Sequence, residues 1–70
     1  MINGIIDGFD DRRGDGYLLG DDGRRAYFHC VNIANGLRTV ANGARAAGER
    51  SVGHLGRDEV IDVTILRTSP

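Results

Sequence analysis

The fold is decided by Arg13-Gly14-Asp15-Gly16-Tyr17-Leu18-Leu19 and, a few residues later, by Ala26-Tyr27-Phe28-His29-Cys30. Between these stretches, Gly20-Asp21-Asp22-Gly23 predicts a tight turn. Glycine readily adopts positive φ there, and Asp side chains bond to nearby backbone groups. Two short segments joined by such a turn are typical of a β-hairpin.

The side chains of this hairpin should divide between two faces. Successive strand residues point in opposite directions, which puts Tyr17 and Leu18 on different faces. By the same alternation, Tyr27 and His29 share one face and Phe28 lies on the other. We therefore expect an apolar underside and an aromatic, histidine-bearing upper side, and the upper side is the candidate functional surface.

Short strands are expected along the rest of the chain as well. Residues 60–66 alternate with a period of two and carry β-branched side chains on one face. Asn-Gly pairs at 35–36 and 42–43 indicate turns. The expected strands cover residues 1–9, 16–20, 25–30, 44–52 and 60–66, with a single helical turn at 31–34. Short strands separated by turn signals, without a long helical pattern, predict a small all-β barrel.

Length and composition indicate one small domain without a strong electrostatic partner. The chain has 70 residues, and a chain of this size buries only about 60% of its surface, so its stability is marginal. The formal net charge is −1, and all nine basic residues are arginine. Without a surplus of positive charge, strong unspecific binding to nucleic acid is not expected.

The remaining composition bears on location. One cysteine excludes an internal disulfide and suits a reducing compartment. No apolar run is long enough to span a membrane, and the apolar start at 1–6 is too short for a signal peptide. We therefore expect a cytoplasmic protein with no membrane partner.

The order of these features resembles the cold-shock domain, a five-stranded OB-type barrel that binds single-stranded RNA and DNA. The first RNA-binding motif of that family, roughly Lys-Gly-Phe-Gly-Phe-Ile, is matched by residues 13–18. The second, roughly Val-Phe-Val-His-Phe, is matched by residues 26–30. Residues 4–6 and 9, the run 36–40 and the pair 42–43 also fall where the family has counterparts. The resemblance implies an antiparallel, partly open Greek-key barrel over residues 1–67, followed by a tail at 68–70.

The resemblance also implies a function and a set of binding residues. Single-stranded nucleic acid is held by aromatic side chains because every base has a π-face, at about 1–3 kcal/mol per stacked base. An RNA-chaperone-like binder of RNA or DNA is thus expected. Its implied binding residues are Phe9, Arg13, Tyr17, Tyr27, His29, Leu37 and Arg57. Phe9 is equally typical of a buried core residue.

Several positions depart from the family pattern. The tryptophan and the lysine before Phe9 are replaced by Gly8 and Asp7, and two phenylalanines of the motifs are replaced by Asp15 and Cys30. Lost rings and added negative charges both predict weak binding to a polyanion. The alternative function is that of a divergent barrel that binds a protein partner or a second copy of itself.

The segment 44–52 is the least regular of the expected strands, and residues 44–47 by themselves could equally begin a helix. The resemblance places Ala46, Gly48 and Arg50 at inward positions. Glycine inside a strand often marks a bulge or a close approach of backbone. If instead Gly48 is an inward site with room, Gly48→Val is expected to stabilise the fold.

No constellation for catalysis or metal binding is visible. Cys30 lacks an accompanying base and oxyanion site, which nucleophilic catalysis needs. His29, Cys30 and His54 have no zinc-site spacing. We therefore expect neither an enzyme nor a metal or other cofactor.

Overall fold

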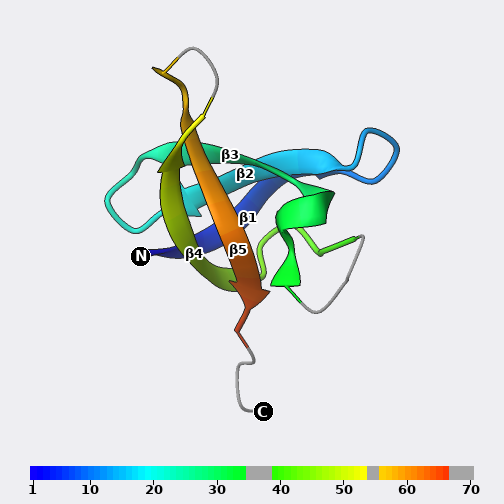
Figure 1. Cartoon of the computed structure of the whole chain (residues 1–70). Coiled ribbons are helices and arrows are strands. Elements are labelled where there is room, and N and C mark those ends of the chain that lie inside the picture. Colours follow the sequence, from blue (N-terminus) through cyan, green and yellow to red (C-terminus); the bar gives the residue numbers. More distant parts are fainter. Residues whose placement is uncertain (35–38, 54–55, 67–70) are drawn as a thin grey trace.

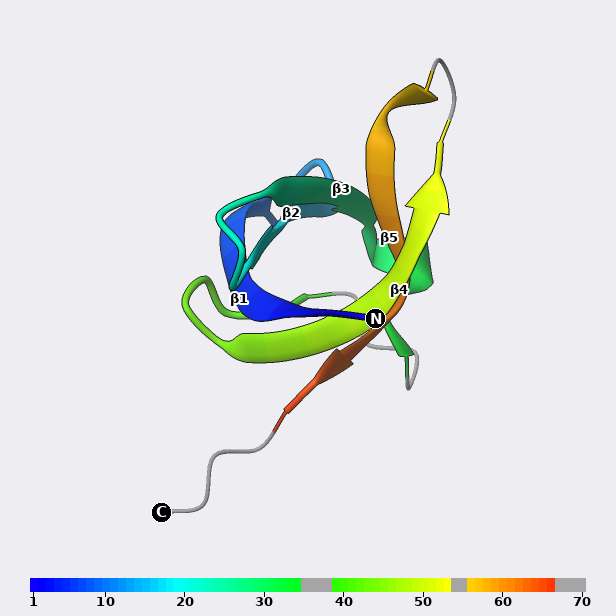
Figure 2. The same ribbon diagram turned by 90° about the vertical axis from the view of Figure 1, so that its left-hand side faces the viewer.

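The described residues of the computed structural model, 1–34, 39–53 and 56–66, form a closed five-stranded barrel with strand order β1-β2-β3-β5-β4 (Figures 1 and 2). The elements are β1 (Ile2–Asp10), β2 (Asp15–Gly20), β3 (Arg25–His29), the 3₁₀ turn η1 (Cys30–Asn32), β4 (Arg45–Val52) and β5 (Asp58–Ile65). The expected all-β, five-stranded barrel is confirmed, and its architecture is consistent with an OB-type fold.

Two details of the barrel differ from the expectation. The pairs β1–β2, β2–β3, β1–β4 and β4–β5 are antiparallel, but β3 and β5 are parallel, joined at Tyr27 and Glu59. A further parallel bridge joins Ile33 to Val63. Each of the five strands pairs with two neighbours, so the barrel is closed rather than partly open. Parallel pairing needs a long crossover, which the chain between β3 and β5 supplies by way of η1 and β4.

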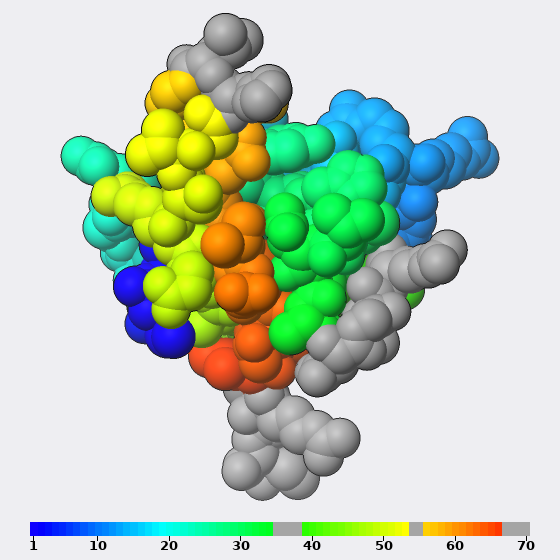
Figure 3. Space-filling view, viewed as in Figure 1, coloured from blue at the N-terminus to red at the C-terminus, as the bar shows by residue number. Residues whose placement is uncertain are grey.

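The core fills the barrel from all five strands and from the segment after η1. Leu18 and Phe28 are fully buried, as alternation in the hairpin predicts. The Phe28 ring stacks on that of Phe9 at 5.8 Å between centroids. The space-filling view shows β5 lying beside η1 on one side of the barrel (Figure 3). The buried apolar side chains are Ile6, Phe9, Leu18, Ala26, Phe28, Ile33, Ala46, Ala47, Val60 and Val63.

A bulge in β1 explains why Phe9 belongs to the core. Asp7 pairs with Tyr17 and Asp10 with Asp15, so two residues of β1 lie opposite one residue of β2. Gly8 takes positive φ (68°) at this point, as glycine does in many bulges. The extra residue shifts the alternation by one, and Phe9 joins the inward face of Ile6.

A second bulge interrupts the pairing of β4 with β5. The register shifts between Ala47 and Glu49, and Asp62 on the opposite strand takes positive φ (52°). Ala46 and Gly48 are buried as expected, but Arg50 is exposed, so its expected inward position is wrong. The bulge after Ala47 interrupts the inward and outward alternation of side chains along β4, and Arg50 therefore does not reach the core.

Some expectations concern residues that lie outside the described part of the chain. These are Leu37, His54, the expected turn at 35–36, and the end of the expected domain with its tail at 67–70. No helix in the described ranges is long and apolar enough to cross a membrane.

Candidate functional site

The upper side of the hairpin carries Tyr17 and Tyr27 directly opposite each other on β2 and β3. Their ring centroids are 5.9 Å apart and the rings meet edge to face, at 74°. Both side chains are partly exposed, whereas their neighbours Leu18 and Phe28 are fully buried. We call this outward surface, with the side chains that flank the two rings, the tyrosine face.

Two arginines lie over the tyrosine rings. The Arg25 guanidinium is 4.2 Å from the centroid of Tyr17, and that of Arg57 is 4.8 Å from the centroid of Tyr27. Both distances lie within the range of cation–π attraction. The sequence indicated Arg57 through the resemblance but missed Arg25. The hairpin register could have found it, because Arg25 lies two residues before Tyr27 and therefore shares its face.

Asp15 joins the tyrosine face through two side-chain contacts. Its Oδ2 accepts a hydrogen bond from the Tyr27 hydroxyl at 2.8 Å, and its Oδ1 accepts one from Arg13 Nε at 3.0 Å. The bond from Tyr27 is the main cause that lowers the pKa of Asp15 below its ordinary value, and Arg13 adds to the effect against the opposing effect of desolvation. The same bond raises the pKa of Tyr27. Asp15 thus contributes a hydrogen-bonded anion to the tyrosine face.

Each arginine of the tyrosine face has a carboxylate beside it. Arg13 pairs with Asp15 at 2.9 Å and Arg25 with Asp7 at 3.2 Å, both N–O distances. Arg57 Nε lies 4.0 Å from a carboxylate oxygen of Glu59. The positive and negative charges of the tyrosine face therefore balance. A phosphate would have to compete with these carboxylates for each guanidinium.

His29 also lies on the upper side and is partly exposed, on the same face as Tyr27. Its Nδ1 accepts a hydrogen bond from the backbone N–H of Val31 at 3.2 Å and so caps η1. This bond fixes the orientation of the ring at the end of β3, directly opposite Asp15. The exposed part of the His29 ring is accessible to a ligand, and its Nδ1 atom has the structural role of capping η1.

The structure separates Phe9 from the other expected binding residues. Phe9 is 8% exposed and packs in the core against Phe28. Its equally weighted interpretation as a core residue is confirmed, and the buried ring offers little surface on which a base could stack. Gly8 is exposed beside Tyr17, but its positive φ would strain an aromatic residue placed there. Leu37 lies outside the described residues.

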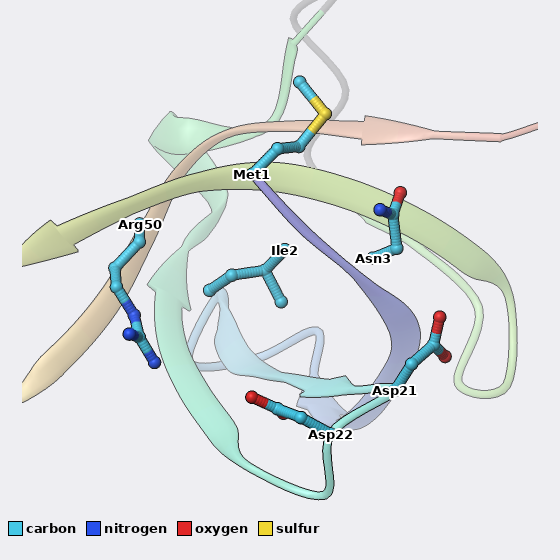
Figure 4. A pocket seen from close by; sticks show the side chains of 6 residues that line it. All are labelled: Met1, Ile2, Asn3, Asp21, Asp22 and Arg50. Carbon is cyan, nitrogen blue, oxygen red and sulfur yellow. The ribbon is translucent and has the colours of Figure 1, made fainter.

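A hollow of about 320 Å³ opens elsewhere, where the start of β1, the β2–β3 turn and β4 meet (Figure 4). Ile2 lies near the middle of the view, with Arg50 on the left and Asp22 below it. Asp21 already accepts hydrogen bonds from both terminal nitrogens of Arg45, at 3.1 and 3.2 Å. The hollow has no aromatic lining, and we place the candidate site on the tyrosine face instead. The residues that line the hollow are Met1, Ile2, Asn3, Asp21, Asp22 and Arg50.

Within the described ranges, no group of three or more His, Cys, Asp or Glu residues is arranged to hold a metal ion. Cys30 is a free, partly buried thiol whose Sγ lies 3.7 Å from His29 Nδ1. That nitrogen accepts the backbone bond from Val31, so in this arrangement it is occupied by the η1 cap.

The comparisons with known proteins do not assign a family to this chain. No protein-family model matches the sequence, and no curated protein matches it either. The functional assignment therefore depends on the residues of the tyrosine face and on the barrel that positions them.

Proposed function

We propose that the protein binds single-stranded RNA or DNA weakly through the tyrosine face, in the manner of the cold-shock domains that its sequence resembles. The observation that supports this most is the pair Tyr17 and Tyr27, partly exposed and each covered by an arginine. Aromatic rings and guanidinium planes both stack on unpaired bases. A surface of alternating rings and guanidinium groups suits a flexible strand with splayed bases.

The charge balance of the tyrosine face sets the expected strength. Each of the arginines is next to a carboxylate, so a phosphate gains less from it than from an isolated cation. Affinity should then come mainly from stacking, with a modest dependence on salt. The acidic residues at 7 and 15 favoured a protein partner in the sequence. In the structure both of them neutralise arginines of the same face, which weakens that alternative.

Binding of labelled oligo-dT and oligo-U at low and moderate salt tests the proposal. Tyr17→Ala and Tyr27→Ala should each weaken binding by about 5- to 150-fold, the equivalent of about 1–3 kcal/mol per stacked base. Arg25→Ala should also weaken binding. The neighbouring Arg24 is exposed, and within the described residues the arginines over the tyrosine rings are Arg25 and Arg57, so Arg24→Ala is the control for Arg25→Ala with the same loss of charge.

Two results would count against nucleic-acid binding through this face. One is the absence of binding by the wild-type protein at low salt. The other is binding that Tyr17→Ala leaves unchanged while Arg25→Ala and Arg24→Ala reduce it equally, because that pattern indicates charge alone. Comparison of the two oligonucleotides separates a preference for RNA from one for DNA.

A further inference from the structure

A turn at residues 41–44 leads the chain into β4 and contains an Asn-Gly pair, Asn42 and Gly43. The Ala44 N–H donates a hydrogen bond to the Ala41 carbonyl oxygen at 3.2 Å, and Gly43 takes positive φ (90°). Glycine has no side chain to shield its backbone nitrogen, and its backbone readily bends so that this nitrogen reaches the preceding side chain. An Asn-Gly pair is therefore especially open to deamidation, in which the side-chain amide of Asn is lost.

In the folded chain, β1 holds both of the groups that would react. Asn42 Oδ1 accepts a hydrogen bond from the Phe9 N–H at 2.7 Å, and Asn42 Nδ2 donates one to the Phe9 carbonyl oxygen at 3.3 Å. The Gly43 N–H donates to the Ile6 carbonyl oxygen at 2.7 Å, and the Ile6 N–H donates to the Ala44 carbonyl oxygen at 2.9 Å. We call these four bonds the β1 clamp. The Gly43 nitrogen has to leave Ile6 before it can reach Asn42 Cγ, so deamidation requires the clamp to open.

We propose that Asn42 is a deamidation site that the β1 clamp protects in the folded chain, and that deamidation removes the clamp for good. Once the clamp opens, the Gly43 nitrogen forms a bond to Asn42 Cγ and gives its proton to the solvent. The Cγ–Nδ2 bond breaks, and Nδ2 takes up a proton and leaves as ammonia. Water then opens the resulting cyclic imide at either of its carbonyl carbons, which leaves aspartate or isoaspartate at position 42. The reaction consumes one water molecule and needs no oxidant or enzyme.

Neither product restores the β1 clamp. Aspartate has no N–H to donate to the Phe9 carbonyl oxygen, and a carboxylate oxygen in the place of Nδ2 would repel it. Isoaspartate adds a carbon atom to the main chain within the turn, which breaks the spacing between Ala41 and Ala44. The turn directly precedes the Ile5–Arg45 pair, where β1 and β4 begin to close the barrel. Deamidation therefore weakens the barrel at the junction of these two strands.

Mass spectrometry of the protein after incubation at mildly alkaline pH measures the protection. Trypsin cleaves after Arg38 and Arg45, and the peptide 39–45 has Asn42 as its only asparagine. A synthetic peptide of residues 39–45 and the protein in denaturant are the unprotected references. Deamidation of Asn42 in the folded protein should be slower than in both references by about tenfold or more, because it requires a local opening. An equal rate in the folded protein overturns the inference, and so does a lack of deamidation in the references.

Asn42→Asp places one of the two products in every molecule. It should lower the melting temperature by about 4–8 °C, the shift expected when a domain of this size loses one hydrogen bond. Ala41→Asp is the matched control, because it adds the same charge to the same exposed turn and keeps Asn42. Amide hydrogen exchange of Gly43 should also be faster in Asn42→Asp than in Ala41→Asp, since this N–H belongs to the β1 clamp. Equal melting temperatures and equal exchange in the two variants would overturn the claim that deamidation removes the clamp.

Discussion

The Tyr27 hydroxyl donates a hydrogen bond to Asp15 Oδ2 at 2.8 Å, between the two central strands of the tyrosine face. This bond lowers the pKa of Asp15 and raises that of Tyr27. A carboxylate whose folded pKa is depressed adds stability above its unfolded pKa, and that stability is lost as the pH falls through the folded value. A tyrosine whose pKa is raised adds stability below its unfolded pKa, which is lost as the pH rises through the folded value.

Tyr27→Phe should therefore raise the pKa of Asp15 toward the usual value of about 3.9. Arg13 remains beside Asp15 at 2.9 Å, so a part of the depression should persist. NMR titration of the Asp15 carboxyl carbon measures the change. Tyr17→Phe is the control, because the Tyr17 ring contacts Tyr27 and Arg25 and should leave Asp15 as it is. An unchanged Asp15 pKa in Tyr27→Phe would show that the hydrogen bond is not formed in solution.

Phe28→Ala and Tyr27→Ala should differ sharply in their effect on stability. Phe28 is fully buried against Phe9, and removing such a ring costs about 3–5 kcal/mol. The neighbouring Tyr27 is partly exposed, so Tyr27→Ala should lower the free energy of unfolding much less. Thermal or denaturant unfolding of the two variants measures the difference. A larger loss for Tyr27→Ala would contradict the assignment of the two faces.

Asn42→Ala should destabilise the barrel although Asn42 is exposed. The bulge at Gly8 removes the backbone of Phe9 from the β1–β2 ladder. The Asn42 side chain replaces the lost partners, accepting from Phe9 N–H at 2.7 Å and donating to Phe9 C=O at 3.3 Å. Leaving such groups unsatisfied costs about 1–3 kcal/mol. Denaturant unfolding measures the loss, and stability equal to that of the wild type would mean that water replaces the amide without cost.

Gly48→Ala should destabilise the protein, and Gly48→Val should do so more strongly. A Cβ at this position would overlap Val60 Cγ2 and lie 3.0 Å from the Ile61 carbonyl oxygen. The room that would have made Gly48→Val stabilising is therefore absent. Overpacking of this kind costs about 1–3 kcal/mol. Gly23→Asn is the comparison, because that glycine faces open space with positive φ, which Asn tolerates. Equal melting temperatures for Gly48→Ala and the wild type would contradict the close approach.

Local sequence patterns predicted the hairpin and the inward positions of Leu18 and Phe28. Strand alternation and a glycine-aspartate turn are short-range signals, and nothing in the tertiary structure overrides them here. The burial of Phe9 followed from a bulge at Gly8 that shifts the alternation by one. The exposure of Arg50 followed in the same way from the bulge after Ala47. Gly48 was a sequence signal for the second bulge, because glycine inside a strand often marks one. The resulting change of register depends on the partner strand, which a single sequence does not show.

The composition of the tyrosine face was predictable only in part. The two tyrosines and His29 came from the motifs, but Arg25 was not among the predicted binding residues. The pairing of each arginine with a carboxylate depends on neighbouring strands, as between Asp7 on β1 and Arg25 on β3. Charge counts over the whole chain cannot reveal such pairs. The parallel contact of β3 with β5 likewise depends on the long crossover between them.

Tyrosine emission during titration with oligo-dT tests the central claim, that bases stack on Tyr17 and Tyr27, most directly. The chain has two tyrosines and no tryptophan, so emission excited in the tyrosine absorption band comes from these two rings. At low salt we predict a saturable quenching of the emission, partly reversed by added salt. Free tyrosine amide in an equal titration corrects for absorption by the oligonucleotide. Quenching no greater than that of the free amide would contradict the account.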